Sequence, residues 1–472
     1  MNTRQMYGRR VIKTDVSMVT SKNICEVLTK AMGHHIANSA DIQYLWDYYR
    51  GQQPILSRTK VVRPEICNKI VENRANEIVT FKVGYLCGEP IQYIGKNGDE
   101  AVSKGVSQLN EMMASENKDS KDTKLVEWQM IAGTGYRLVL PNDDVLEDNP
   151  FKVHTLDPRN TFVVYSTDVG NKPMLGVTYY TDDMGVRIYS VYSNSFFWKI
   201  KGDAIVEGRP HGLGMIPIFE YPANTARLGS FEIVLPLLDT LNNIASNRMD
   251  GIEQFVQSFI KFVNCDIDEE QFKALKELGA IKVKSTDGAT ASVDIITSSL
   301  DQSQTQVTKD DIHQAILSIC GMPSVGNGQS DSSNNGAVIL KNGWQGAETR
   351  AKNSELLFKE SEREMLKLVL KICRDTVGTP DEVCSLRVTD IDPHFTRRNY
   401  ENIQSKSQVL VSMLQQPKIH PRLAFEASGL FIDPEGAYAE SMKYHEEQMP
   451  IVENESPALT DEENAEDANQ ND

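Results

Sequence analysis

A one-sided run of apolar residues after Ser230 constrains this chain more than any other feature of its sequence. The run spans about eight turns of helix at spacings of three and four, and its members are Leu237, Leu241, Ile244, Ile252, Phe255, Phe259 and Phe262. Only Arg248 interrupts this apolar face. The hydroxyl of Ser230 predicts the helix start, because it can accept backbone N–H bonds in the first turn. We expect one long helix over residues 230–263, packed in a core or against another subunit rather than against lipid.

Two further helices are predicted beyond this one, with a polar segment between them. Residues 264–307 favour a small α/β insert, with a short helix in DIDEEQFKALKELGA and strands in IKVK and ASVDIITSS. The second helix is expected to begin at Thr308 and to stop at Gly321, with Pro323 beyond it. The third is expected from about residue 342 to residue 376. The polar segment is far longer than the roughly two to eight residues of a usual helix connection.

β signals dominate residues 130–221. Short β-branched or aromatic segments such as NTFVVYST and VRIYSVYS are separated there by Asp, Gly, Asn and Pro. Residues 25–93 are largely helical and end in the β-prone run FKVGYLCGEPIQY, whereas residues 96–124 are polar with one amphipathic piece. Near the C-terminal third, EVCSLRVTDID has the composition of a strand. The mixture predicts an α+β fold.

The last part of the chain favours helices that are interrupted by proline. Residues 398–447 have helical character with breaks at Pro417, Pro421 and Pro434. The acidic, weakly hydrophobic residues 449–472 are expected to be disordered.

Composition excludes several classes of protein. The chain has 472 residues, enough for two to four domains. Its formal net charge of -17 argues against tight nonspecific binding to nucleic acid or anionic membranes. Its seven cysteines include no CxxC pair, which argues against a disulfide framework or a thiolate zinc site. We expect no signal peptide and no membrane partner, because no apolar stretch is long enough to span a bilayer.

The sequence predicts no catalytic residue, no cofactor and no metal site. A P-loop needs Gly-Lys-Ser/Thr after its first glycine, but Gly336 is followed by alanine and Lys341 by asparagine. The histidines are scattered, without an HxxxH or HExxH motif, and no GxSxG elbow occurs. Acid pairs such as Asp182–Asp183 and Asp310–Asp311 could hold a divalent ion, but a turn or a helix start explains them better.

Four sets of segments carry a resemblance to a known family. They are YYRGQQPIL (48–56), NKIVENRANEIVTFKVGYLCGEPIQY (68–93), HGLGMIPIFEYPAN with SFEIVLPLLDTLNNIASNRMDGI (211–252), and ICGMPSV with GAVILKNGW (319–344). In this order they resemble the portal proteins of tailed bacteriophages, specifically those of long-tailed phages of Gram-positive hosts. The resemblance extends over most of residues 40–445.

The resemblance implies a portal fold with a strand-rich wing, a helical stem, a small α/β clip, a tunnel loop and a helical crown. Its expected boundaries are an N-terminal arm (1–40), the wing (41–229), stem helix 1 (230–263), the clip (264–307), stem helix 2 (308–323), the tunnel loop (324–337), a long wing helix (338–376), a wing strand segment (377–398), the crown (399–448) and an acidic tail without an assigned role (449–472). The implied assembly is a ring of about twelve subunits at a capsid vertex, through which double-stranded DNA is packaged and ejected.

The implied DNA-facing residues are those of the tunnel loop, namely Asn327, Gln329, Ser330, Asp331, Ser332, Ser333, Asn334 and Asn335. Such side chains make weak, interchangeable phosphate contacts, and few basic residues means little salt-dependent grip on sliding DNA. The basic candidates for the tunnel are Arg248, Lys261, Lys309 and Lys341, each of which could equally form a salt bridge within or between subunits.

The implied partners are other copies of the chain, double-stranded DNA in transit, the terminase motor, a head–tail adaptor, and the major capsid and scaffolding proteins. The protein would act in the virion and, during assembly, in the cytoplasm of the bacterial host. ATP hydrolysis would belong to the separate motor. Two alternatives stay open: a metal-dependent phage nuclease that uses aspartate pairs, and a monomeric capsid adaptor.

Overall fold

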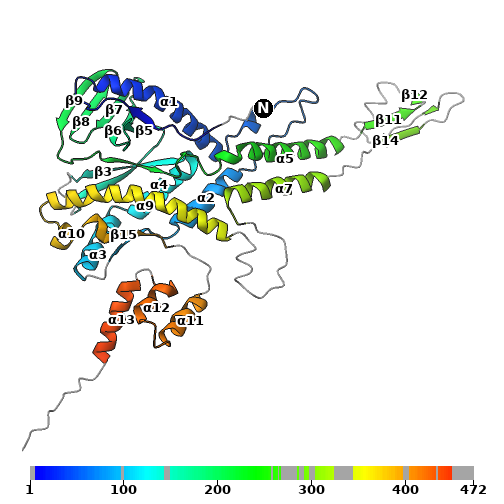
Figure 1. Cartoon of the computed structure of the whole chain (residues 1–472). Helices are drawn as coiled ribbons and strands as arrows, with labels where there is room; N and C mark the ends of the chain where they lie inside the picture. The colour runs from blue at the N-terminus through cyan, green and yellow to red at the C-terminus, as the bar shows by residue number, and fades with distance from the viewer. Residues whose placement is uncertain are drawn as a thin grey trace, which may run out of the picture. The chain divides into compact units, whose positions relative to one another are not determined.

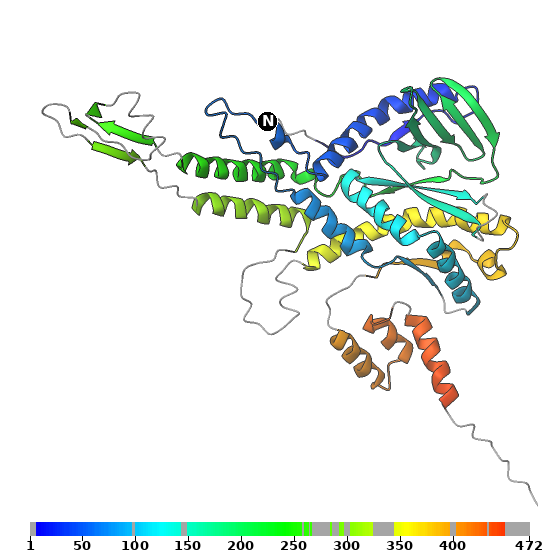
Figure 2. The ribbon, with the colours of Figure 1, turned by 180° about the vertical axis from the view of Figure 1, so that it is seen from behind.

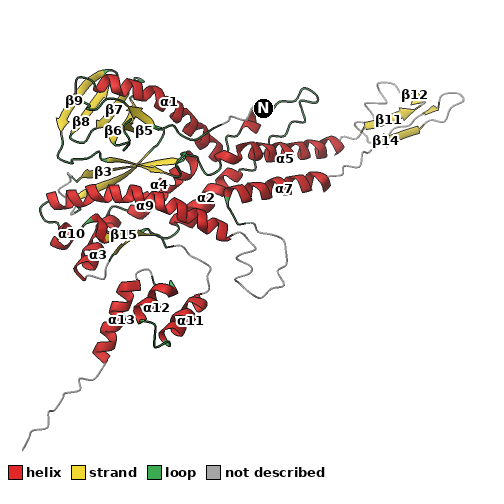
Figure 3. Cartoon of the chain, in the orientation of Figure 1, coloured by secondary structure: helices red, strands yellow, loops and turns green. Residues whose placement is uncertain are grey.

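The chain forms two compact units, Met1–Arg398 and Asn399–Asp472. The computed structural model describes residues 6–96, 100–142, 149–256, 259–263, 265–266, 284–285, 292–296, 303–323, 344–396, 403–431 and 434–448. In this part of the chain, the first unit mixes helices with several sheets, whereas the second contains helices only (Figure 3). This mixture agrees with the predicted α+β class.

A six-stranded sheet covered by one long helix forms one part of the first unit. The strands are β1 (Ile12–Thr14), β5 (Thr161–Ser166), β6 (Pro173–Thr181), β7 (Arg187–Tyr192), β8 (Phe196–Lys201) and β9 (Ala204–Pro210), which lie side by side in that order. β1 pairs with β5 in parallel, and the other neighbours are antiparallel. Helix α1 (Ile24–Tyr49) covers this sheet (Figure 1), and its Ile24 and Leu28 share a core with Phe162 and Trp198.

A three-stranded sheet forms another part of the first unit. Its strands are β10 (Ile218–Pro222), β3 (Thr134–Pro141) and β4 (Phe151–Leu156), in that order. Side chains alternate along β3, as they do in any strand. Gly135 and Arg137 face helices α4 (Lys118–Ala132) and α9 (Trp344–Asp375), whereas Tyr136 and Leu138 pack with Val163 of β5. Both faces of β3 are therefore buried.

The strand-rich character expected for residues 130–221 is confirmed, because β3 to β10 lie between Thr134 and Pro222. The β-prone run FKVGYLC is instead part of helix α2 (Arg74–Cys87), whose Ile78, Val79 and Leu86 are buried. Packing of this apolar face outweighs the intrinsic β preference of the run. Only β2 (Gln92–Gly95) is a strand there.

Two other segments are more helical than expected. The polar residues 96–124 contain α3 (Glu100–Ser115) and the first part of α4. The segment EVCSLRVTDID forms α10 (Asp381–Ser385) and the 3-10 turn η3 (Val388–Asp390). Only its end enters β15 (Ile391–His394), which pairs with β2.

The long helix predicted over residues 230–263 is shorter than expected. After the 3-10 turn η2 (Glu232–Val234), helix α5 runs from Leu235 to Val256. Residues 259–263 form strand β11, which pairs antiparallel with β14 (Ser292–Ile296). The spacing of Phe259 and Phe262 fits a helix, but the run FIKFV also consists largely of strong strand formers, and short apolar runs are ambiguous between the two.

The insert after β11 is described only in part. Two short strands, β12 (Cys265–Asp266) and β13 (Lys284–Ser285), pair antiparallel. The expected helix DIDEEQFKALKELGA lies outside the described residues apart from Asp266. Helix α7 (Ser303–Cys320) then begins before Thr308, where the helix start was expected, and ends at the predicted residue.

The second unit consists of three short helices in its described part. They are α11 (Ile403–Leu414), α12 (Pro421–Ser428) and α13 (Pro434–Gln448). Pro421 and Pro434 each occupy the first position of a helix, where a missing N–H is tolerated, so the predicted breaks are confirmed. The Phe425 ring stacks on Phe431 and meets the edge of Tyr438. The tail 449–472 lies outside the described residues.

Candidate functional site: a two-helix arm and the helix ends at its base

Helices α5 and α7 lie side by side as a two-helix arm, as both views of the ribbon show (Figure 1 and Figure 2). Near its base the arm is held by apolar packing, with Leu238 and Leu241 of α5 and Ile316 of α7 all buried. Farther out, Arg248 donates from Nη1 to Gln306 Oε1 at 2.7 Å. The contacts between the two helices are therefore apolar at the base of the arm, and they include a polar contact farther out.

A strap formed by residues 58–73 runs along α5 and is bound by a polar stripe on that helix. Asn242 accepts the Glu72 N–H at 2.9 Å, and Ser246 accepts the Ile70 N–H at 2.9 Å. One turn farther on lies Asp250. Since the three positions are spaced by four residues, they share one face of α5.

Asp250 makes the densest contacts with the strap. Its carboxylate accepts the backbone N–H of Asn68 at 2.7 Å and lies 3.0 Å from both Lys60 Nζ and Arg58 Nη2. Burial raises the pKa of Asp250, but hydrogen bonds from Asn68 and Lys60 outweigh it and hold that pKa below its ordinary value. The carboxylate is therefore charged at neutral pH and fixes the strap to the arm.

The four basic residues predicted for the tunnel lie in different parts of the structure. Arg248 and Lys309 both lie on the arm, and each has a protein partner. Lys309 forms an ion pair with Glu72 of the strap, which agrees with the salt-bridge alternative for this residue. Lys261 lies on strand β11 rather than on a helix. Lys341 and the eight predicted loop residues between Asn327 and Asn335 lie outside the described residues.

The strap and its acceptors on α5 were not predicted from the sequence. Its signal was present, since Asn242, Ser246 and Asp250 form a polar stripe with the period of a helix. The partners of these polar groups lie far away in the chain. They can be identified only in the folded structure, where the two segments come together.

The end of α7, just before the segment 324–343, is fixed by backbone hydrogen bonds. Helix α7 ends in a Schellman motif, in which Met322 N donates to Leu317 O at 2.8 Å and Gly321 N donates to Ser318 O at 3.1 Å. Gly321 has φ +65°, the left-handed conformation that favours glycine. The expected stop at Gly321 is therefore confirmed.

The first turns of α9 return the chain to the same place. Arg350 donates to the carbonyl oxygens of Ile319 and, at 3.3 Å, of Ser318 at the end of α7. The Trp344 ring lies 6.0 Å from the rings of Phe81 and Tyr85 on α2. Both ends of the segment 324–343 are thus held where α2, α7 and α9 meet.

The start of α5 is held from the N-terminal side. The Arg9 guanidinium lies 2.6 Å from the Glu232 carboxylate, and both side chains are fully buried. The same carboxylate accepts the N–H groups of Gly8 at 3.0 Å and Gly229 at 2.8 Å. A buried carboxylate with a cation and two amide donors is well satisfied, so the base of the arm is tied to the N-terminal segment.

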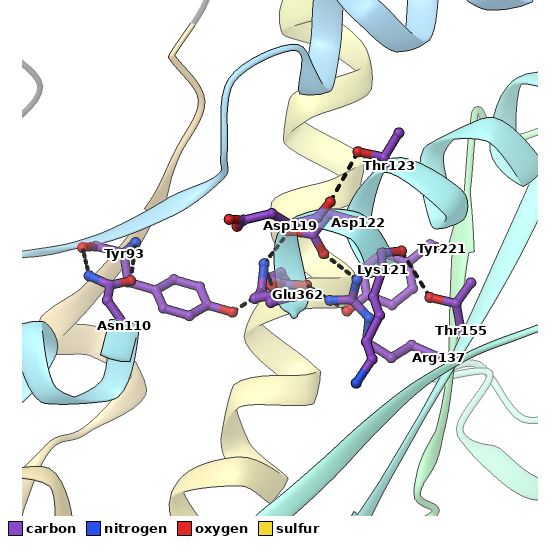
Figure 4. A network of polar contacts seen from close by, with 11 residues as sticks. Tyr93, Asn110, Asp119, Lys121, Asp122, Thr123, Arg137, Thr155, Tyr221 and Glu362 are labelled. Atoms are coloured by element: carbon purple, nitrogen blue, oxygen red, sulfur yellow. Dashed lines mark hydrogen bonds and ion pairs between the residues drawn. The ribbon is translucent and has the colours of Figure 1, made fainter. Parts of the chain in front are cut away.

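A buried ionic cluster fastens α9 to the rest of the first unit (Figure 4). Glu362 of α9 lies 3.1 Å from Lys118 Nζ on α4 and 3.2 Å from Arg137 Nη1 on β3. Both cations also contact Asp122, so two positive and two negative groups are balanced in the core. Burial raises the pKa of Glu362, but Lys118 and Arg137 hold it well below its ordinary value.

Two tyrosines complete this cluster. The hydroxyl groups of Tyr93 and Tyr221 each donate to one oxygen of Glu362, both at 2.6 Å. The Glu362 carboxylate therefore receives four donors from four different elements. A buried ion pair stabilises only when its remaining hydrogen-bonding groups are satisfied, and both oxygens of Glu362 are satisfied here, whereas Nε of Arg137 has no partner among the described residues. The cluster has the character of a structural joint rather than of a reactive site.

No candidate metal site is found in the described part of the chain, where no group of three or more His, Cys, Asp or Glu could hold a metal ion. Asp182 instead closes a turn by accepting the Val186 N–H at 2.8 Å, and Asp310 accepts from Gln306 at 2.8 Å. Within the same part of the chain, no helix has the length and apolar content needed to cross a membrane.

The mixture of helices and several sheets in the described residues is compatible with the fold of a phage portal protein. A model of the family described as phage portal protein, SPP1 Gp6-like, matches residues 30–454, and the chain belongs to this family. No curated protein matches the chain. Phage portal proteins are structural proteins of the capsid vertex of tailed phages, act in DNA packaging, and as a family imply an oligomeric ring.

Proposed function

We propose that the chain assembles into a ring of about a dozen subunits that forms the channel for double-stranded DNA during packaging and ejection. The observation that carries this proposal is the arm, whose two helices start and end beside the base of the segment 324–343. In a ring, such arms would form the wall of a tunnel, and a segment held at both ends at the base of the arm would project from that wall.

The parts of the chain take the following roles in this proposal. Helices α5 and α7 are the stem, and residues 257–302 between them are the clip, which would meet the motor and later the head–tail adaptor. The sheets and α9 form the wing toward the capsid shell, and α11 to α13 form the crown. In this proposal the clip begins at residue 257 instead of residue 264, and the pairing of β11 with β14 supports this choice.

Residues 324–337 are proposed as the tunnel loop. With Asp331 and no Lys or Arg, the loop would touch phosphates weakly and exchange contacts easily. Arg248 and Lys309 are bound to Gln306 and Glu72, which leaves them less able to hold a phosphate. A channel with little fixed positive charge lets DNA slide, because each neutralised phosphate adds a salt-dependent grip.

The assembly is tested by the molar mass of the purified protein. Light scattering should give about a dozen chain masses, although rings formed outside the phage can contain a different number of subunits. A stable monomer at all concentrations would contradict the ring and favour a monomeric adaptor. Nuclease activity that depends on a divalent ion would contradict a non-enzymatic conduit, and it should be absent.

A further inference from the structure

A cavity of about 200 Å³ lies at the base of the arm, where α2, the start of α5, the end of α7 and the start of α9 meet. Its walls are largely apolar, and they include Phe81, Tyr85, Met130, Ile233, Ile319 and Ala351. Ile233 and Ile319 are 53% and 41% exposed, so apolar surface continues from the cavity to the outside of the molecule.

The polar groups of this cavity are mainly donors. Lys82 of α2 lines it and forms no hydrogen bond or ion pair with any residue that the structure describes. Burial lowers the pKa of Lys82 below its ordinary value, the nearby Cys320 opposes this shift, and Arg350 adds a smaller lowering effect. The Ser230 hydroxyl also lines the cavity and is buried without a hydrogen-bond partner among the described residues.

Negative charge is missing from the walls. Among the described lining residues there is no Asp or Glu, and the Arg350 guanidinium is engaged by two backbone carbonyls. Glu348, on the same stretch of α9, accepts the Tyr85 hydroxyl at 2.8 Å and lies 3.6 Å from Lys352. A partly buried ammonium and a buried hydroxyl without acceptors are both costly, so the cavity suits an anionic group that accepts hydrogen bonds.

The shape of the cavity decides between two kinds of anion. A phosphate of duplex DNA is bound on both sides to sugars and stays on the outside of a wide, stiff helix. It cannot enter a cavity of about 200 Å³. A carboxylate at the end of an amino-acid side chain can enter, and the apolar rim at Ile233 and Ile319 would then pack against the neighbours of that residue.

We propose that this cavity receives an aspartate or glutamate side chain from an adjacent copy of the same chain in the assembled ring. The inference rests on the proposed ring. A cyclic ring joins two different faces of each subunit, so a pocket on one face meets a projection on another. The chain supplies acidic groups in excess, with 66 Asp and Glu against 49 Lys and Arg. Lys82 and Ser230 would hold the incoming carboxylate, and the isoleucines would exclude water around it.

Amine labelling of the full-length protein tests the proposal directly. Monomer and ring are separated, treated briefly with an acetylating reagent, and analysed by peptide mass spectrometry. We expect Lys82 to be acetylated in the monomer and protected about tenfold in the ring, because the bound carboxylate covers and charges the amine. Lys30 of α1, which is 70% exposed, is the control and should be labelled equally in both.

Two variants give an independent reading. Lys82→Met keeps the length of the side chain but removes the charge, and should raise the protein concentration needed for half-assembly by about tenfold or more. Lys82→Arg keeps the charge and should assemble nearly as the original protein does. Equal loss of assembly in both variants would overturn the proposal, because a purely structural role of the lysine stem would then explain the effect.

The remaining outcomes are also decisive. Equal labelling of Lys82 in ring and monomer would overturn the inference and leave the ring intact as a proposal. Protection of Lys82 already in the monomer would mean that the chain fills its own cavity, and protection of the monomer by inorganic phosphate with unchanged assembly would mean a small-anion site. Both would overturn it. A protein that never forms a ring would overturn the proposed function as well.

Discussion

Arg350 of α9 lies directly over Gly321 at the end of α7. A Cβ added to this glycine would stand 2.7 Å from the guanidinium carbon of Arg350, closer than Cβ atoms come to other atoms in proteins. The same guanidinium binds the carbonyl groups of Ser318 and Ile319. The end of one arm helix and the start of the long helix are therefore joined by an arginine that needs a glycine beneath it.

Gly321→Ala should destabilise the protein. The substitution places a side chain at φ +65° and displaces Arg350 from the end of α7, which together should lower the free energy of unfolding by about 1–3 kcal/mol. Chemical denaturation measures the change. Gly346→Ala is the matched control, because that glycine is helical and a Cβ there meets nothing within 4 Å, so it should be neutral or slightly stabilising.

Glu362→Gln should be among the most damaging single substitutions in the first unit. It leaves Lys118 and Arg137 buried with only Asp122 to balance them, and breaking a buried ion pair in this way costs about 3–5 kcal/mol. Thermal and urea unfolding measure the loss. Glu364→Gln removes a half-exposed partner of Lys367 on the same helix and should change stability by less than about 1 kcal/mol.

The same carboxylate predicts a pH dependence. The pKa of Glu362 is lowered from 4.5 to about 2 in the folded protein, because Lys118 and Arg137 outweigh the effect of burial. A folded pKa below the unfolded one means that the stabilisation is complete above about pH 4.5 and is lost as the pH falls toward 2. Unfolding free energies between these values should fall more steeply for the original protein than for Glu362→Gln. Parallel curves would contradict this assignment.

Asp250→Ala should release the strap from α5. The substitution removes the acceptor of the Asn68 N–H and leaves Arg58 and Lys60 without their carboxylate. Trypsin should then cleave after Arg58, Lys60 or Lys69 about tenfold faster, since proteolysis follows the population of the open segment. Glu253→Ala on the same helix is the control and should leave the cleavage rate unchanged.

Lys309→Gln should loosen the contact between the arm and the strap, and it should leave the affinity of the ring for DNA unchanged. The lysine is bound to Glu72, so its removal should loosen the strap while the salt dependence of DNA binding by the ring stays as it was. Filter binding at several salt concentrations measures that slope. A clearly shallower slope would show that Lys309 contacts phosphates, contrary to the contact with Glu72.

Replacement of Asn334, Asn335 and Gly336 by proline tests the proposed tunnel loop. If the segment yields to moving DNA as proposed, stiff and bulky residues there should shorten the packaged DNA while light scattering still detects rings. Packaged DNA of normal length would argue that the loop has no role in passage. Loss of the rings would instead assign the segment to assembly.

Local chemistry made part of the fold predictable. Gly321 at a helix end and Pro421 and Pro434 at helix starts impose their conformation whatever surrounds them, so these boundaries were correct. The secondary structure expected for the segments FIKFV and FKVGYLC was wrong, because their local sequence does not decide between helix and strand. Each fits helix or strand equally well, and the choice depends on which distant element covers it, β14 for the first and a helical core for the second.

The candidate site was predictable only in its outline. The sequence placed Arg248 and Lys309 on neighbouring helices, but not the partners that bind them. Glu72 lies far from Lys309 along the chain, and neither residue carries a pattern that pairs them. The ionic cluster was beyond reach for the same reason, since Lys118, Arg137 and Glu362 come from three separate elements that meet only in the folded core.

The position of the ionic cluster on α9 has a mechanical consequence. Arg350 and Glu362 lie on one continuous helix, about 18 Å apart at the rise of an α-helix. Glu362 binds this helix to the sheet, and Arg350 binds its start to the end of α7, just before the segment 324–343. A tilt of the helix at Glu362 by about 10° would therefore shift Arg350 by about 3 Å. If α9 moves as one rigid helix, the end of α7 and the sheet are therefore mechanically coupled through the contacts of Arg350 and Glu362.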